Sequence, residues 1–389
     1  MVVGGGISGL ATALAIRIAS QKHGGPGLRV VLVNDGVLGG DSATVQNGGT
    51  IHTGASYALG HQREAQWCRQ TVGTVSAALP DDCVISRKSF YLVRRAQIDH
   101  YLRRLDELGL LHERCGPRDL SEMLRPEPAA GVAGVVIDEL QADMSETVLR
   151  FTQACLDAGV DIVIDAPVRE IVEDGRGGVS AVRLSCGTLV TAGRVLICAG
   201  PGTTGLLRTL NRRPRHVLAE IYDHHATHIV LAQGNVAYPV RGAEPGLPVV
   251  TQLRDYQSIS LYGVPPQVET AKSIDQILTV FRSWFLPGAL ELDDIVAVTQ
   301  VSKVEFHGPH MARSTLPRVL DGRDLGVAGL WCLIPGKLSH AIWLALAMPR
   351  SLGFDEVHPA DVRERLDQVG PRAHELFGQP LRVHEIGGV

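Results

Sequence analysis

The sequence predicts an α/β protein in which a Rossmann-like dinucleotide-binding domain carries a second, mostly antiparallel β-sheet domain. Three observations lead to this fold class. The first 35 residues follow the order strand, glycine-rich loop, helix and strand, which is a βαβ unit. The 43 glycines cluster where strand patterns run into helix patterns. The segment 213–305 is rich in strand patterns and holds one amphipathic helix, 273–284.

The βαβ unit begins almost at the first residue. The strand Val2–Val3 is short, and a helical pattern follows its glycine loop as far as about Ser20. A polar, glycine-rich loop over 21–27 leads into an apolar strand over 29–35. Because the first strand is so short, the sequence leaves open whether the natural start of the chain lies upstream.

The first loop carries the spacing Gly4-x-Gly6-x-x-Gly9. One glycine makes a turn that other residues resist, the next lets the backbone approach a pyrophosphate, and the third lets helix and strand pack closely. The pyrophosphate then meets the free N–H groups of the helix N-terminus. The ribose partner at the end of the second strand is usually acidic. Asn34 stands at that position and Asp35 follows it, so either residue is a candidate.

The rest of the chain alternates between helix and strand patterns. The segments 36–60 and 118–134 are expected to be an ordered loop and an irregular connection. Helices are expected at 62–79, 97–108, 144–158, 273–284, 338–348 and 359–366. Strands are expected at 83–93, 160–164, 168–173, 179–184, 188–191, 195–198, 221–222, 258–261 and 329–334, of which those from 160 to 191 read as a meander.

Composition narrows the classes of function. The chain has 37 Lys and Arg residues and 41 Asp and Glu residues. It therefore lacks the overall positive charge that would attract nucleic acid. The seven cysteines form no CxxC pair, which favours reduced thiols and a cytoplasmic location. The apolar start lacks the basic residues of a signal peptide, and no apolar run is long enough to span a membrane.

A second glycine-rich segment gives the chain a family likeness. Together with the N-terminal fingerprint, the run from Asn47 to Tyr57 resembles the FAD-dependent D-amino-acid-oxidase-like superfamily. Within that run, Ile51-His52-x-Gly54-x-x-Tyr57 is similar to L-2-hydroxyglutarate oxidases and FAD-dependent glycerol-3-phosphate dehydrogenases. The likeness covers most of the flavin half of the chain and is weak over roughly 205–310.

Three later segments carry the same resemblance. Gly159-Val160-x-Ile162 followed by Val168-x-x-Ile171 is similar to the strand whose valine backbone meets the adenine. The run Leu196 to Gly200 resembles the strand and turn that close over FAD. The run Ile334 to Ser339 is similar to the Gly-Lys-Leu-Thr segment near the flavin ring of glycerol-3-phosphate dehydrogenases.

The resemblance implies FAD as cofactor and a discontinuous FAD-binding domain. We expect that domain to comprise 1–83, 144–208 and 318–389, and the substrate domain to comprise 84–143 and 209–317. The residues expected to bind FAD are Gly4, Gly6, Ile7, Ser8, Gly9, Asn34, Asp35, Gly48, Gly49, Thr50, Ile51, Val168, Ala199, Gly200, Gly336, Lys337, Leu338 and Ser339.

Four residues are candidates for catalysis. Flavin chemistry needs a base for the substrate O–H or N–H proton and a cation near flavin N1. Lys337 is the candidate cation, and His52 is the candidate base, a residue against the flavin ring, a point of covalent flavin attachment as in some relatives, or a structural histidine. Tyr57 either hydrogen-bonds substrate or packs as a core aromatic. Arg313 resembles an arginine that relatives use near the active site, where its fork suits a carboxylate or phosphate.

A group of histidines invites a metal-site hypothesis. Asp223, His224, His225 and His228 lie in a strand-like stretch, but no cysteine or spaced carboxylate completes a ligand set. We therefore expect no metal, and active-site lining or structural roles remain the alternatives. His340 lies close to Lys337 in sequence and is a weaker candidate.

The sequence favours FAD-dependent oxidation of a small polar substrate at a CH–OH carbon, by hydride transfer to flavin N5. One alternative is an amine or amino-acid oxidase that acts on CH–NH, and another is a flavoprotein whose FAD is structural. An NAD-linked dehydrogenase is disfavoured, because it does not account for the strand that runs into Ala199-Gly200. The electron acceptor (oxygen, quinone or a protein) and a homo-oligomeric state stay open.

Overall fold

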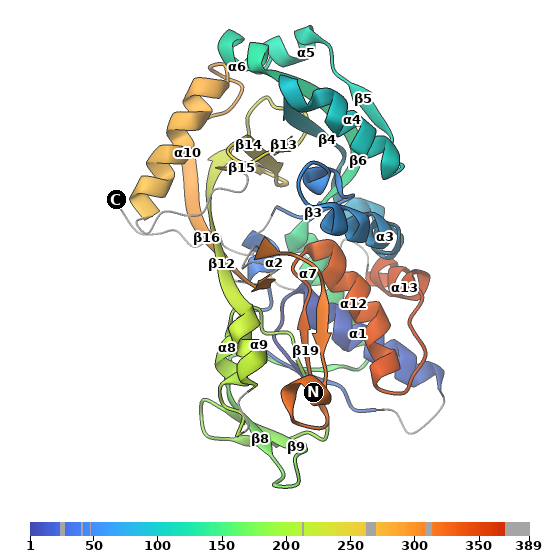
Figure 1. Cartoon of the computed structure of the whole chain (residues 1–389). Coiled ribbons are helices and arrows are strands. Elements are labelled where there is room, and N and C mark those ends of the chain that lie inside the picture. Colours follow the sequence, from blue (N-terminus) through green and yellow to red (C-terminus); the bar gives the residue numbers. More distant parts are fainter. Residues whose placement is uncertain are drawn as a thin grey trace.

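A six-stranded sheet forms the lower half of the molecule in the computed structural model (Figure 1). The structure describes residues 1–23, 28–39, 42–46, 48–211, 214–261, 270–307 and 313–369. The strand order is β18 (Arg318–Leu320), β19 (Leu330–Ile334), β11 (Val195–Ile197), β1 (Val2–Val3), β2 (Val31–Val33) and β7 (Asp161–Val163). All neighbours are parallel except β18 and β19, so the predicted Rossmann-like unit is confirmed.

The two faces of this sheet are buried against different layers. Alternate residues of a strand point to opposite faces, so Val2 and Leu196 pack against the helices, whereas Val3 and Ile197 pack against the smaller sheet and its neighbours. The helical layer contains α1 (Ile7–Lys22), α3 (Gln62–Ala78), α7 (Met144–Asp157), α12 (Leu338–Ser351) and α13 (Pro359–Val369).

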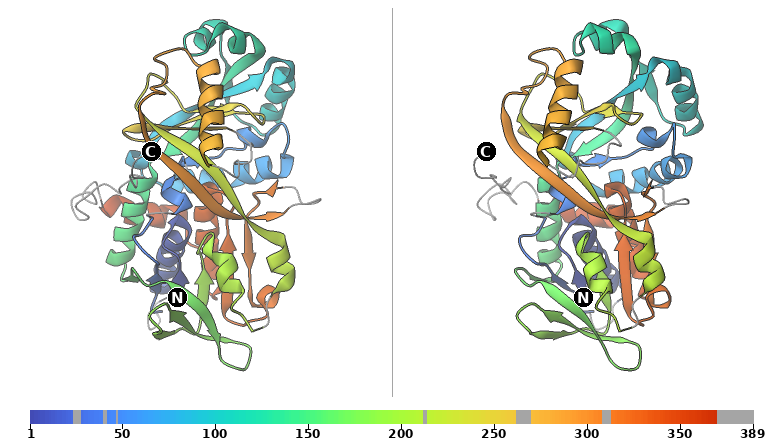
Figure 2. Two further views of the ribbon diagram at one scale, coloured as in Figure 1. Left: turned by 90° about the vertical axis from the view of Figure 1, so that its left-hand side faces the viewer. Right: turned by 60° about the vertical axis from the view of Figure 1, so that its left-hand side comes forward.

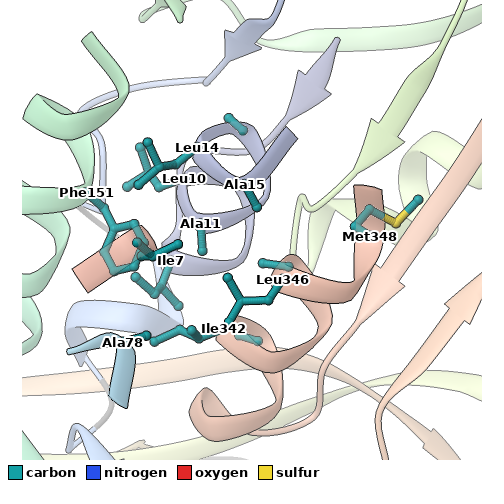
Figure 3. Close-up of a cluster of buried hydrophobic side chains, with 14 of the residues drawn as sticks. Ile7, Leu10, Ala11, Leu14, Ala15, Ala78, Phe151, Ile342, Leu346 and Met348 are labelled. Atoms are coloured by element: carbon teal, nitrogen blue, oxygen red, sulfur yellow. The ribbon is translucent and has the colours of Figure 1, made fainter. Parts of the chain in front are cut away.

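Helix α1 lies at the centre of the helical layer, in contact with α7 and α12. Figure 3 shows Ile7 and Leu10 of α1 near Phe151 of α7, with Ile342 and Leu346 of α12 on the other side. Because α1 is enclosed in this way, its N-terminus is held rigidly at the carboxyl ends of β1 and β2.

A three-stranded meander covers the opposite face. Its order is β10 (Leu189–Thr191), β9 (Val179–Leu184) and β8 (Val168–Glu173), with antiparallel neighbours. From the meander the chain enters β11, and the short helices α8 (Gly202–Leu207) and α9 (Arg215–Glu220) then lead towards the upper half of the molecule.

The second, larger sheet confirms the expected mostly antiparallel domain. Its order is β17 (Arg313–Ser314), β16 (Ile295–His307), β12 (Ile221–Ala232), β15 (Tyr256–Leu261), β14 (Pro248–Gln252), β13 (Val240–Gly242), β4 (Val84–Arg94), β6 (Val132–Ala142) and β3 (Thr50–Ile51), with β5 (His112–Arg114) beside β6. Figure 2 shows the antiparallel pair β12 and β16 running from the upper half towards the lower half.

Shorter elements complete the fold. They are α2 (Ala43–Gln46), η1 (Ala55–Tyr57), η2 (Asp81–Cys83), η3 (Arg95–Gln97), α4 (Ile98–Glu107), α5 (Pro117–Ser121), α6 (Pro126–Gly131), α10 (Thr270–Trp284) and α11 (Gly322–Leu325). In the described part of the chain, none of the helices combines the length and apolar character that a membrane span needs.

Four local expectations were wrong. The segment 160–164 is not part of the meander, because β7 pairs with β2 in the parallel sheet. The segment 118–134 is not irregular: it holds α5, α6 and the start of β6, since Pro126 takes the first helical position, where proline is tolerated. The segment 36–60 contains α2, β3 and η1. The strand expected at 221–222 is twelve residues long, and an unexpected strand of thirteen residues, β16, pairs with it.

Candidate functional site

A cavity of about 1640 Å³ lies at the carboxyl ends of β1, β2 and β11 and extends to the large sheet. Its walls come from the loops after these three strands, from α7, from β16, and from the segment 335–337 together with Leu338, the first residue of α12. In an open α/β sheet this edge is where ligands bind. The cavity therefore joins the dinucleotide-binding motif to the residues that the sequence assigned to catalysis.

The glycine loop fits a pyrophosphate closely. Gly4 has a φ of +108°, and a Cβ there would lie 2.4 Å from the Cys198 carbonyl oxygen. A Cβ on Gly9 would lie 1.8 Å from the Gly4 carbonyl oxygen, so only glycine lets α1 approach β1 this closely. The first turn of α1 contains no acidic residue, which leaves its N-terminus favourable to an anion. These features fit the diphosphate of FAD.

The two candidates for the ribose differ in their surroundings. Asn34 Oδ1 accepts a hydrogen bond from the Gly5 backbone N–H (2.8 Å), and Asn34 Nδ2 donates to the Gly36 carbonyl (2.9 Å). The Asn34 amide thus braces the glycine loop. Asp35 is exposed at the cavity edge, so its carboxylate is the better placed of the two to accept from ribose hydroxyls.

Replacing Asp35 with asparagine is expected to weaken FAD binding about 10-fold, because a charged acceptor is lost while the loop brace of Asn34 remains. The measurement is a fluorescence titration of the apoprotein with FAD. Asp99→Asn, an exposed change on α4 away from the cavity, is the matched control. Equal FAD affinity in Asp35→Asn and the control would exclude the carboxylate from ribose binding.

Apolar side chains line the far end of the cavity. Leu156 of α7 and Ile164 after β7 are 44% and 51% exposed, although both face the cavity with Val168. A flat aromatic group inserted here would cover apolar surface that is otherwise left in water. This end therefore fits the adenine of FAD, as the sequence predicts for Val168.

Polar and charged groups gather at the opposite end. Thr50, His52, Lys303 and Lys337 line the cavity there. Lys303 Nζ forms an ion pair with Glu305 (2.9 Å), and Lys337 Nζ lies 4.7 Å from the centre of the Tyr57 ring. The same ring lies edge-on to His52, with 5.8 Å between the ring centres.

His52 is held in its neutral form. Burial is the main cause that lowers its pKa well below the usual value, and the positive charges of Lys337, Arg241 and Lys303 add to the effect. Its Nδ1 atom is buried without a hydrogen-bond partner, and Glu139 Oε1 lies 4.0 Å away. A neutral imidazole in the wall of the cavity is a candidate to accept a proton from a substrate.

Glu139 of β6 fixes the loop that carries His52. The Glu139 carboxylate is buried and accepts from the Thr53 backbone N–H (3.0 Å), from Thr53 Oγ1 (3.1 Å) and from the Tyr91 hydroxyl (2.8 Å). Ser56 Oγ lies 2.9 Å from the same hydroxyl. These bonds connect the large sheet to the segment from β3 to η1 and orient it against the cavity.

His340 is a buried structural histidine on α12. Its Nδ1 atom lies 3.1 Å from the Pro335 carbonyl oxygen, and its Nε2 atom lies 3.8 Å from Cys68 Sγ. Burial lowers its pKa to about 4. His340 therefore anchors the segment that precedes Lys337, and it does not line the cavity.

The histidines of β12 form no metal site. His225 Nδ1 lies 2.6 Å from Ser302 Oγ, and His228 Nδ1 lies 3.3 Å from Ser258 Oγ. No group of three or more His, Cys, Asp or Glu side chains that could hold a metal ion occurs among the described residues. Burial lowers the pKa of His228 to about 4, so this histidine is neutral as well.

Acid is expected to destabilise the protein between pH 7 and pH 5. The pKa values of His52, His228 and His340 are lowered in the folded state, so the unfolded chain binds more protons as the pH falls below 6.5. Their contribution to stability is present above pH 6.5 and is lost below it. Thermal unfolding should show a Tm lower by several degrees at pH 5, with a shallower slope in His228→Gln. A Tm that is constant or rises towards pH 5 would contradict this assignment.

Most of the predicted cofactor residues line the cavity. They are Gly4, Gly6, Ile7, Ser8, Asn34, Asp35, Gly49, Thr50, Val168, Ala199, Gly200, Gly336, Lys337 and Leu338. Gly9, Gly48, Ile51 and Ser339 are buried behind this lining. Of the predicted catalytic residues, His52 and Lys337 line the cavity and Tyr57 lies under Lys337, whereas the Arg313 side chain falls outside the described part of the structure.

Several lining residues were missed from the sequence. Val148, Thr152 and Leu156 repeat every fourth residue along α7, which is also the pattern of a helix face buried in a core. Gln300 and Ser302 lie on either side of the buried Val301 on β16, and that alternation is the signal that could have found them. No local sequence pattern marks Arg241 of β13 or Glu139 of β6 as part of a site, because the residues around each of them are those of an ordinary β-strand.

The fold agrees with that of several solved oxidases and dehydrogenases. NikD, an unusual amino acid oxidase essential for nikkomycin biosynthesis, has a TM-score of 0.68 at 18% identity, over 94% of this chain and 95% of NikD. L-proline dehydrogenase from P. horikoshii has a TM-score of 0.68 at 14% identity, over 95% and 96% of the two chains. Glycine oxidase from Bacillus cereus has a TM-score of 0.63 at 17% identity, over 99% of both chains.

These comparisons support the superfamily and not the finer resemblance to hydroxyglutarate oxidases and glycerol-3-phosphate dehydrogenases. No curated protein matches the sequence. Residues 1–312, which are most of the chain and include the whole glycine loop from Gly4 to Gly9, match the family described as FAD dependent oxidoreductase. The chain belongs to this family of FAD-dependent oxidoreductases.

Proposed function

We propose that the chain oxidises a small amine or amino acid at its C–N bond. The observation that supports this most directly is His52, a neutral histidine that lines one end of a cavity whose other end fits adenine. When bound, FAD supplies the acceptor for the hydride that leaves the substrate carbon. His52 takes the proton that the substrate nitrogen must lose.

The positive groups around His52 favour a substrate that carries negative charge. Lys303 and Lys337 line the cavity beside His52, and Arg241 lies behind its wall. An ammonium ion alone would be repelled here, whereas the carboxylate of an amino acid would be attracted. Tyr57 keeps Lys337 in place by packing under its ammonium group.

The choice of a C–N bond also rests on the similar folds. NikD, proline dehydrogenase and glycine oxidase are named for amino-acid substrates, which reverses the order of the two hypotheses drawn from the sequence. Oxidation at CH–OH remains the second candidate, because a neutral base serves an alcohol equally well. The segment Gly336-Lys337-Leu338-Ser339 favours it, through its likeness to glycerol-3-phosphate dehydrogenases.

Product analysis separates the two reactions. We expect the FAD-loaded protein, supplied with an artificial electron acceptor, to convert amino acids to imines that hydrolyse to a carbonyl compound and ammonia. The matched substrates are alanine and lactate, which share a carbon skeleton and differ only in the group that is oxidised. Ammonia released in step with acceptor reduction supports the proposal, and turnover of the hydroxy acids alone would overturn it.

A further inference from the structure

Glu139 presents a buried carboxylate to one ring nitrogen of His52. Its Oε1 atom lies 4.0 Å from His52 Nδ1. This nitrogen is buried as well, whereas the His52 side chain as a whole is 18% exposed and lines the cavity. The ring therefore turns Nδ1 inward, towards β6, and presents the edge that carries Nε2 to the cavity.

Other hydrogen bonds fix the position of this carboxylate. Glu139 Oε1 accepts from the backbone N–H and the hydroxyl of Thr53, the residue after His52, and Oε2 accepts from the Tyr91 hydroxyl. An ionised carboxylate has about four acceptor sites, so one of them is left for a donor on His52. A distance of 4.0 Å is longer than a hydrogen bond, but catalytic pairs are often long before substrate binds and shorten in the complex.

Arg241 does not use this acceptor site. Glu139 attracts the Arg241 guanidinium, but the guanidinium donates its hydrogen bonds to neutral groups, which belong to Thr50, Gln141 and Thr251. The oxygens of Glu139 therefore remain available to His52, although the charge of Glu139 also stabilises Arg241.

This arrangement favours one tautomer of His52. A neutral imidazole carries a proton on only one of its two nitrogens. With the proton on Nδ1, the ring donates towards the Glu139 carboxylate. With the proton on Nε2, the lone pair of Nδ1 would face a negative oxygen in a buried site, which is unfavourable. The favoured tautomer leaves Nε2 as the bare nitrogen at the cavity.

We propose that Glu139 is a positioning residue that keeps the His52 proton on Nδ1 and stabilises the imidazolium formed when Nε2 takes the substrate proton. In this step the substrate N–H bond breaks, its electron pair stays on nitrogen, and an Nε2–H bond forms. The role of His52 as a base rests on the proposed function, whereas the tautomer rests on the geometry of the two side chains.

The other charged groups around His52 make this role necessary. Lys337, Lys303 and Arg241 are positive and oppose a second charge on the ring, and the remaining titratable neighbours are His340 and Tyr57. A carboxylate beside Nδ1 offsets this repulsion at the moment of proton transfer.

The tautomer is tested without any turnover. In the FAD-loaded protein with isotope-labelled histidine, nitrogen NMR distinguishes a protonated ring nitrogen from a bare one, and the His52 signals are those that His52→Asn lacks. We expect the proton on Nδ1 at neutral pH. A proton on Nε2 would overturn the positioning role of Glu139.

Glu139→Gln tests the electrostatic role. Glutamine keeps an acceptor for Thr53 and removes the negative charge, so the pKa of His52 falls further. We expect anaerobic flavin reduction by an amino acid to slow about 10-fold, and the acid limb of its pH profile to move to lower pH. Glu113→Gln, an exposed change on the neighbouring strand β5, should leave the rate and the profile unchanged. A wild-type rate in Glu139→Gln, or a slower rate with an unmoved acid limb, would show that Glu139 does not act through the charge of His52.

The outcomes separate this inference from the proposed function. If Glu139→Gln does not fold, the tautomer of the wild-type protein still decides the inference. A proton on Nδ1 in a protein that oxidises no amino acid would keep the role of Glu139 in setting the tautomer and reject the proposed function. Amino-acid oxidation by a protein whose His52 carries its proton on Nε2 would keep the proposed function and reject the role of Glu139.

Discussion

Replacing Gly9 with alanine is expected to abolish FAD binding. The new Cβ would lie 1.8 Å from the Gly4 carbonyl oxygen, so α1 has to move away from β1. That movement withdraws the N-terminus of α1 and the glycine loop from the diphosphate. The loss of these two contacts weakens FAD binding by more than about 100-fold. The measurement is the ratio of flavin absorbance to protein absorbance after reconstitution with FAD.

Gly36→Ala is the matched control for this change. Gly36 also lines the cavity, but a Cβ there would meet no atom within 4 Å. The control should bind FAD like the wild type, and circular dichroism should show whether Gly9→Ala keeps its secondary structure. A Gly9→Ala protein that retains a full complement of FAD would contradict the assignment of this loop to the diphosphate.

Replacing His52 with asparagine is expected to slow the reduction of bound flavin by amino acids about 100-fold. General base catalysis contributes a factor of this order or more, and asparagine cannot take up the substrate proton. FAD content should not change, because His52 lies at the end of the cavity opposite the apolar adenine end and is not part of the glycine loop. Stopped-flow measurement of the first-order reduction rate under anaerobic conditions tests the prediction.

Two further variants sharpen the His52 experiment. His61 is exposed and lies on the other side of Tyr57, at 6.2 Å between ring centres, so His61→Asn should reduce flavin at the wild-type rate. Lys337→Met removes a positive charge that lowers the pKa of His52, so the acid limb of kcat/KM should move to higher pH. A His52→Asn rate within about threefold of the wild type would remove His52 from proton transfer.

The sequence predicts the two sheets well where local pattern and pairing agree. Val2–Val3, α1 and β2 follow each other at short range, so their pattern alone identifies the βαβ unit. Strand β7 was assigned to the wrong sheet because its pattern is that of any apolar strand. Its partner is decided by α7, which crosses the sheet and delivers the chain beside β2. Strand β6 was missed because prolines and glycines precede it, although they only shape the short helices before it.

The residues of the candidate site also divide into those that a local sequence pattern identifies and those that only the folded sheet brings together. Glycines and motif residues of the cavity could be predicted, since their spacing has a local physical reason. The residues behind the wall could not, because Arg241 comes from β13 and both Gln141 and Glu139 come from β6, two strands that β4 joins only in the folded sheet. Asn34 shows a role that the motif does not predict, because its amide braces the glycine loop while the residue lines the cavity.

The absorbance of FAD bound in the cavity gives the most direct test of the proposed reaction. The protein is loaded with FAD, made anaerobic and mixed with alanine or lactate, and the flavin absorbance is followed. We expect that alanine or another amino acid bleaches the flavin and that the matched hydroxy acid does not. Bleaching by hydroxy acids alone, or by none of the acids tested, would contradict oxidation at a C–N bond.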